Sequence, residues 1–189
     1  MTQYYTRGRT MKKVMYVAMI LLLGSAFSSF NAYSEEHQMG APVTHTKDFE
    51  KMKELVDVWE GKVDMGKGME TLRVTYELTS AGNAIVERFA AGKPHEMVTV
   101  YYDFGGKLTM THYCSLGNQP HMEQMGSGGN ELVFVLSEKN PGLASLNEMH
   151  MHGLKIALEG KDNITNTWTL YDQGVKKSEM PIKLSRIKM

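Results

Sequence analysis

Polar and apolar positions follow two different periods along this chain, and the change comes near Trp59. Before that point, a segment that begins at Thr46 repeats its apolar residues at steps of three and four. The apolar positions of the segment are Phe49, Met52, Leu55, Val56 and Trp59. Such spacing predicts one short amphipathic helix of about three turns, with Thr46 or Asp48 as its N-cap.

From Trp59 onward, apolar and polar residues alternate, and turn signals recur roughly every 8 to 12 residues. This pattern is typical of a β-sandwich or a β-barrel. It predicts ten strands, at residues 59–65, 70–78, 84–89, 97–103, 107–114, 119–125, 131–136, 149–158, 165–171 and 179–188.

Four connections carry strong turn chemistry, because Gly, Asn or Asp supplies a positive φ at residues 81–83, 104–106, 126–129 and 161–163. Short hairpins make neighbouring strands antiparallel, and closing the sheet removes edges that would otherwise aggregate. We therefore expect an all-β fold, a ten-stranded antiparallel up-and-down barrel, in a single domain over residues 46–189. A barrel of this size is expected to enclose a cavity.

The first 34 residues differ from the rest and have the layout of a secretory signal peptide. Four basic residues between positions 7 and 13 precede an apolar run at 14–27, and small or polar residues follow. Cleavage is expected after Ser34, with Ser28 as the alternative. The run is shorter than the roughly 20 residues that span a bilayer, so we expect no stable membrane anchor after cleavage; a retained anchor is the alternative. Residues 35–45 are expected to be a disordered lead-in.

Charge and cysteine content narrow the classes of function. The chain has 21 Lys plus Arg against 21 Asp plus Glu, so no net field attracts nucleic acid, and we expect no nucleic-acid partner. The signal peptide predicts a secreted or periplasmic location. Cys114 is the only cysteine, which excludes an internal disulfide, so the core alone must stabilise the fold.

Several motifs point to a known group of proteins. The segment Val58-Trp59-Glu60-Gly61 looks like the tryptophan signature in the first strand of lipocalin-like and fatty-acid-binding barrels. Lipocalins usually have glycine two residues before this tryptophan, whereas this chain has Asp57.

Three further motifs resemble a family of uncharacterised, secreted, lipocalin-like bacterial proteins over nearly all of residues 48–187. They are Thr111-His112-Tyr113-Cys114, Gly117-Asn118-Gln119-Pro120 and His150-Met151-His152. The resemblance implies a calycin-type barrel and brings no established substrate.

Alternation along two predicted strands suggests a ligand site at one rim of the barrel. His112 and Cys114 share a face with apolar residues of the fifth strand, and His150 and His152 do so in the eighth, so all four are expected to face the lumen. Three chain reversals separate the end of the fifth strand from the start of the eighth, so both lie at the same rim of the barrel. The loops at 93–95, 116–120 and 137–148 are expected at this rim. The expected ligand-binding residues are His112, Asn118, Gln119, His150, His152 and Met110.

These residues favour an exported cell-envelope protein that binds a small apolar or amphipathic molecule in its barrel. The alternative is a metal or haem site formed by His112, Cys114, His150 and His152, since imidazole and thiolate suit Zn²⁺ and copper; no cofactor is required. In another interpretation the histidines only hydrogen-bond one another, Tyr113, Glu148 or buried water inside a polar cavity. A third class of function, an envelope structural or interaction module without a small ligand, predicts a barrel filled by its own side chains.

Enzymatic activity is not expected. Cys114 beside His112 suggests a thiol nucleophile, but no orienting acid is identifiable, and no phosphate loop, nucleophile elbow or paired-carboxylate motif is present.

Overall fold

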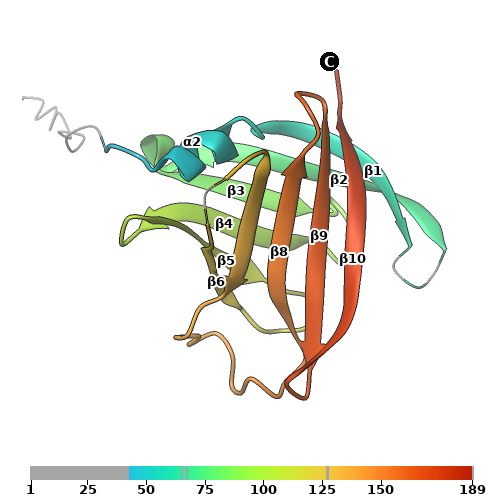
Figure 1. The fold of residues 1–189 in the computed structure, drawn as a ribbon. Helices are drawn as coiled ribbons and strands as arrows, with labels where there is room; N and C mark the ends of the chain where they lie inside the picture. The colour runs from blue at the N-terminus through green and yellow to red at the C-terminus, as the bar shows by residue number, and fades with distance from the viewer. Residues whose placement is uncertain (1–42, 65, 67, 127, 189) are drawn as a thin grey trace, which may run out of the picture. The chain divides into compact units, whose positions relative to one another are not determined.

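The computed structural model describes residues 43–64, 66, 68–126 and 128–188. The predicted signal peptide and most of the predicted lead-in lie outside these residues. The described chain forms one short helix followed by ten strands (Figure 1). The elements are α2 (Lys47–Lys53), β1 (Asp57–Asp64), β2 (Met69–Thr79), the 3₁₀ turn η1 (Ser80–Gly82), β3 (Ala84–Phe89), β4 (Met97–Phe104), β5 (Lys107–Tyr113), β6 (His121–Gln124), β7 (Glu131–Leu136), β8 (His150–Leu158), β9 (Asn163–Asp172) and β10 (Val175–Arg186).

The strands close into an antiparallel barrel in which each strand pairs with its neighbours in sequence and β1 also pairs with β10. This confirms the predicted ten-stranded up-and-down barrel. The largest boundary error is at β10, which starts at Val175 rather than 179. Gln173 and Gly174 make the β9–β10 turn with φ of 54° and 72°, and this tight reversal lets both strands run longer. Glutamine is not a usual turn residue, so the sequence pattern did not reveal it.

Helix α2 packs against one end of the barrel, called here the helix end (Figure 1). Of the two predicted N-caps, Thr46 and Asp48, the structure has Thr46, whose Oγ1 accepts a hydrogen bond from the Phe49 amide at 3.1 Å. The helix is shorter than predicted, because the chain turns after Lys53 and enters β1 at Asp57. Within the described residues no helix is long and apolar enough to cross a membrane.

Asp103 in β4 attaches the start of α2 to the barrel. Its carboxylate accepts hydrogen bonds from Thr46 Oγ1 at 2.6 Å and from the Thr46 amide at 2.8 Å. His45 Nδ1 lies 3.2 Å from the same carboxylate, and the His45 ring stacks on Phe49. His45, the last residue of the predicted lead-in, is therefore packed against the barrel.

Side chains of the chain itself fill the barrel. The residues that point inward from the middle of the strands are almost completely inaccessible to water, and large ones predominate. The fully buried side chains of greatest volume are Trp59, Tyr76, Tyr101, Phe49, Phe134, Met52, Leu55, Ile85, Leu108, Met110, Met122 and Leu132. The cavity expected from the strand number is therefore occupied, because the inward positions carry aromatic rings and long apolar chains.

Candidate functional site

Four polar side chains form a continuous row across the inner wall of the barrel. Tyr76 pairs with Glu87, Glu87 with Thr99, and Thr99 with His112, on β2, β3, β4 and β5 in turn. All four are buried. Directly paired residues of an antiparallel sheet share a face, so this row, called the polar belt below, lines the lumen. It runs from near the helix end at Tyr76 to near the opposite end at His112.

The alternating pattern of each strand brings these side chains inside. Ile85, Glu87 and Phe89 of β3 are buried while their neighbours are more exposed. The strand must place every second residue inward, so Glu87 enters the lumen with the apolar residues on either side.

Glu87 is the only Asp, Glu, Lys or Arg that is fully buried among the described residues. Tyr101 donates a hydrogen bond to Oε2 of this carboxyl, and Oε1 has no hydrogen-bond partner. Burial raises the pKa of Glu87 to about 7, although the Tyr101 hydrogen bond acts in the opposite direction. Burial and the nearby Glu87 charge also raise the pKa values of Tyr76 and Tyr101 well above the usual range.

Asn166 reaches the polar belt from β9, on the other side of the lumen. Its Nδ2 donates to the Tyr76 hydroxyl at 2.9 Å, and its Oδ1 has no partner. The ring of Tyr76 lies 6.5 Å from that of Tyr101, which lies 5.6 Å from Phe134. The interior around Glu87 is therefore aromatic and rich in hydrogen-bond acceptors.

His112 faces the lumen, as predicted. Its Nδ1 is 2.9 Å from Thr99 Oγ1, its ring centroid is 4.6 Å from that of Trp168, and its Nε2 has no partner. Burial lowers the pKa of His112 to about 4, so this imidazole is neutral at pH 7. Met110, another predicted ligand residue, is fully buried on the same face of β5.

His150 and His152 do not face the lumen, which corrects the prediction. The β8–β9 register shifts between Met151 and Gly153. Beyond this bulge His150 pairs with Tyr171, which lies on the opposite face of β9 from the inward Trp168. One extra residue reverses the alternation, so both histidines lie on the outer face of the wall, where His150 is almost completely buried and His152 is partly exposed.

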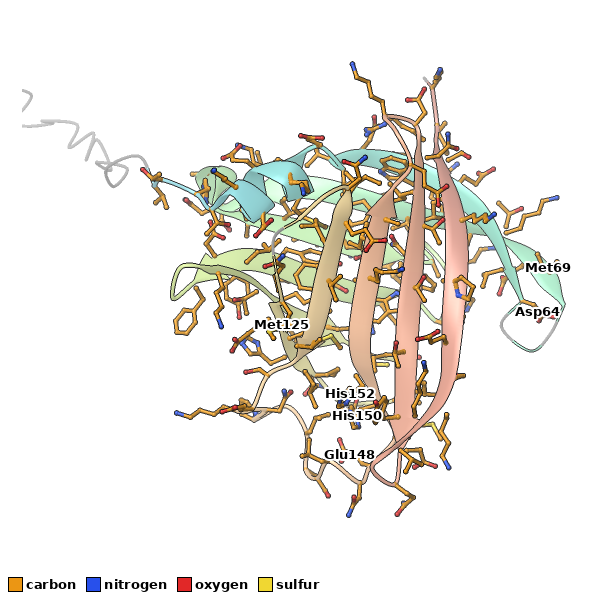
Figure 2. All side chains as sticks on the ribbon, viewed as in Figure 1. Asp64, Met69, Met125, Glu148, His150 and His152 are labelled. Atoms are coloured by element: carbon orange, nitrogen blue, oxygen red, sulfur yellow. The ribbon has the colours of Figure 1, made fainter. Side chains whose placement is uncertain are left out.

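His150 and His152 lie close together at the start of β8 (Figure 2). Both rings also contact the ring of Tyr171. His150 Nδ1 is 2.7 Å from the Glu148 carbonyl oxygen, which can only accept, so this nitrogen carries the proton. His150 Nε2 then accepts from His152 Nδ1 at 3.0 Å, and the His152 ring stacks on Tyr171. Burial, and to a lesser extent His150, lower the pKa of His152.

Asn118 and Gln119 lie in the loop at the end of the barrel opposite α2, called here the loop end. Asn118 Nδ2 donates to Glu148 Oε1 at 3.1 Å and to the Met149 carbonyl at 2.9 Å. The Gln119 backbone N–H donates to the Gly142 carbonyl oxygen at 3.0 Å. These bonds hold the predicted lid, residues 137–148, against the 114–120 loop. A hollow of about 290 Å³ between the two loops is lined by Leu116, Gly117, Asn118, Glu148 and Met149.

The predicted metal-binding set is not brought together. His112 points into the lumen, whereas His150 and His152 lie on the outer face. Cys114 is almost fully buried just beyond β5, and burial raises its pKa, which disfavours a thiolate. Across residues 43–64, 66, 68–126 and 128–188, no three His, Cys, Asp or Glu side chains are grouped so that they could hold a metal ion.

A larger hollow of about 680 Å³ lies at the helix end, beside Trp59, Leu158 and Arg186. The Arg186 guanidinium lies 4.3 Å from the Trp59 ring centroid and donates to Asp57 at 2.9 Å. The Arg186 guanidinium in this hollow is therefore already paired within the protein.

The sequence interpretation missed Tyr76, Glu87, Thr99 and Asn166. A signal was present in each case, because each polar residue lies two positions from a strongly apolar one within an alternating strand. Glu87 is the clearest example, between Ile85 and Phe89. A carboxyl group on the apolar face of a strand is costly to bury unless it is hydrogen-bonded or paired, so its presence there is a signal.

The comparisons with known proteins give no functional assignment. No family model and no curated protein matches the chain. Among solved structures, a protein of unknown function from the DUF3598 family of Nostoc punctiforme matches with 12% identity and a TM-score of 0.49. The match covers 78% of this chain and 53% of the other, so the chain spans about half the length of that protein.

Proposed function

We propose that this protein is an exported binding protein that takes a small apolar or amphipathic molecule into its barrel. The observation that carries the proposal is that three polar atoms inside the barrel have no hydrogen-bond partner. They are Glu87 Oε1, His112 Nε2 and Asn166 Oδ1.

Unpartnered polar atoms are costly in a core that serves only to hold the fold. Each such buried group destabilises the protein by about 1–3 kcal/mol, because water bonds to it in the unfolded chain and nothing replaces that bond. Apolar residues of similar size at 87, 112 and 166 would avoid this cost. A bound molecule with its own polar group would supply the missing partners.

Room for a ligand would come from the most adaptable part of the core. Met110 and Met122 are fully buried and pair directly across β5 and β6, and Met110 also pairs with Tyr101 beside Glu87. Methionine side chains are unbranched and move at low cost. β6 is the shortest strand and has only three paired positions with each neighbour, whereas β1 and β10, which also share only three, each have a long ladder on the other side. We therefore expect the wall to open most readily at β6.

The proposed export rests on the basic and apolar pattern of residues 1–34, which is typical of proteins of the periplasm or the cell exterior. Binding is favoured over catalysis because no metal site is present in the described residues, and because the imidazole beside the Thr99 hydroxyl, that of His112, has no acid on its other nitrogen.

The test uses Trp168, which lies against His112 in the lumen, as a reporter. The chain has two tryptophans, so Trp59→Phe leaves Trp168 as the only one, and Trp168→Phe is the matched control. Fractions of an envelope extract from the natural source are titrated into each variant, and native mass spectrometry is run on protein purified from that source. We expect a saturable change in Trp168 emission, no change in Trp59 emission, and a retained small-molecule adduct.

Protein that is folded by circular dichroism, carries no adduct and shows no change in Trp168 emission would refute the proposal. The filled lumen would then favour the second candidate, an envelope structural or interaction module, because side chains already occupy the space that a ligand would need.

A further inference from the structure

Building on the proposed binding function, we propose that the ligand is a small organic cation, an amine with an apolar body, whose N–H groups donate to Glu87 and Asn166 inside the barrel. The site is the part of the lumen around Glu87, Tyr76, Tyr101, Phe134 and Asn166. The inference goes beyond the proposed function because it specifies the charge and the hydrogen-bonding character of the ligand.

When Glu87 is ionised, the form that a bound cation stabilises, the unpartnered atoms around it are acceptors. Glu87 Oε1 and Asn166 Oδ1 both lack a donor, and Tyr76 links them, since it pairs with Glu87 across β2 and β3 and accepts from Asn166 Nδ2. A carboxylate or phosphate ligand brings only further acceptors. A protonated primary amine brings three donors in a compact head, which matches the need.

The electrostatics of the lumen also favour a cation. Glu87 is the only fully buried acidic or basic side chain in the part of the chain that the structure describes, apart from the histidines, and His112 is neutral at pH 7. In that same part of the chain no buried Lys or Arg is present to neutralise Glu87. The interior is therefore neutral when Glu87 is protonated and negative when it is ionised, and an anionic ligand would have no counter-charge.

The aromatic rings around Glu87 also favour a cationic ligand. Tyr76 and Tyr101 have centroids 6.5 Å apart, and Phe134 is 5.6 Å from Tyr101. The face of an aromatic ring carries negative electrostatic potential and attracts ammonium groups when water is excluded. Rings and a carboxyl group in one dry space thus favour an amine head, while Met110, Met122 and Leu132 supply apolar contact for its body.

The experiment compares three molecules that share one chain length but differ in head group: octylamine, octanol and octanoate. Binding at pH 7 is followed by Trp168 emission in the Trp59→Phe protein, below the concentration at which any of them aggregates. We expect octylamine to bind about tenfold or more tightly than octanol, because close buried charge pairs contribute several-fold more than neutral contacts. Octanoate should be the weakest.

Glu87→Gln tests the residue, because it keeps the shape and removes the charge. This variant should lose the preference for octylamine while octanol binding persists. Glu77→Gln, on the exposed outer face of β2, is the matched control and should keep the preference. Tyr101→Phe serves as the second variant if Glu87→Gln does not fold; it removes the hydroxyl bound to Glu87 and should change octylamine binding more than octanol binding.

The outcomes separate the two proposals. If octanol and octylamine bind equally, or octanoate binds best, the amine inference is overturned and the binding function stands. The amine inference is likewise overturned if Glu87→Gln keeps the full preference. If none of the three changes Trp168 emission in folded protein, and extracts of the natural source do not either, the binding function itself fails.

Discussion

Glu87 and His112 are two titratable side chains of the polar belt whose pKa values move in opposite directions on burial. Burial disfavours the charged form of each, so the pKa of Glu87 rises to about 7 and that of His112 falls to about 4. Both side chains are therefore largely neutral near pH 6. Near pH 6 the lumen therefore combines hydrogen-bonding capacity with little net charge.

Glu87→Gln should change how stability depends on pH. The folded protein holds the Glu87 proton more tightly than the unfolded chain, whose ordinary pKa is 4.5. The contribution of this proton to the free energy of unfolding is therefore fully present below pH 4.5 and is lost as the pH rises to about 7. Relative to wild type, the free energy of unfolding of Glu87→Gln should rise by about 3 kcal/mol between these pH values.

Urea unfolding of both proteins at a series of pH values measures this difference. Wild type alone is a poor test, because His112 acts in the other direction: its depressed pKa stabilises the fold above pH 6.5, and this contribution is lost as the pH falls to about 4. The two effects largely cancel between pH 4.5 and 6.5. If the difference in free energy of unfolding between wild type and Glu87→Gln were the same at every pH, Glu87 would not hold its proton as inferred.

At the scale of single elements, β8 shows how one residue can move a functional group to the other side of a wall. Leu154 and Ile156 point inward as the alternation predicts. The bulge next to Gly153 then places His150 and His152 outside with Tyr171. The same strand thus contributes apolar residues to the lumen and an imidazole pair to the outer face.

Gly61 in β1 is a second position where an element depends on a single residue. A Cβ there would lie 2.2 Å from the Lys183 carbonyl oxygen of β10, a backbone atom that cannot move without disturbing the closing β1–β10 ladder. We expect Gly61→Ala to lower the free energy of unfolding by about 3 kcal/mol or more.

Gly128→Ala is the matched control for that experiment. Its added Cβ would meet no atom within 4 Å and its backbone has no positive φ, so stability should change by less than about 0.5 kcal/mol. Urea unfolding at one pH compares the two variants. If Gly61→Ala and Gly128→Ala changed the free energy of unfolding equally, the close approach of β1 and β10 would not restrict which side chain can occupy position 61.

At the scale of the whole molecule, the barrel is closed but unevenly strong. β9 pairs with β10 from Val175 to Ser185 and with β8 along nearly its full length, whereas β6 pairs over only three positions on each side. A short ladder opens more readily because fewer hydrogen bonds must break and fewer buried side chains must separate at the same time. The weak region lies beside Met110 and Met122, where a ligand would need room.

Hydrogen exchange should reveal this difference directly. The amides of His121–Gln124 are expected to exchange faster than those of the β8–β9 and β9–β10 ladders, under conditions where the whole protein remains folded. Exchange followed by mass spectrometry of peptides measures both regions in one sample. Equal protection of β6 and β9 would remove the proposed route into the lumen.

The sequence by itself was sufficient for the architecture. A period of two with regular turn residues favours antiparallel hairpins, and ten strands in succession favour closure, so the strand number and order could be predicted, and the helix cap was narrowed to Thr46 or Asp48. The inward face of β5 was predictable for the same reason, because that strand is regular from Leu108 to His112.

Only the tertiary structure decided which polar residues meet. The polar belt depends on the register between four strands, and the position of His150 depends on how β8 pairs with β9, neither of which is encoded within one strand. The filling of the lumen depends on the summed volume of side chains from all around the wall. Local alternation sets the face of a residue within a regular strand, but contacts between distant strands arise only when the barrel closes. For this reason, the link from Glu87 through Tyr76 to Asn166 became evident only in the folded protein.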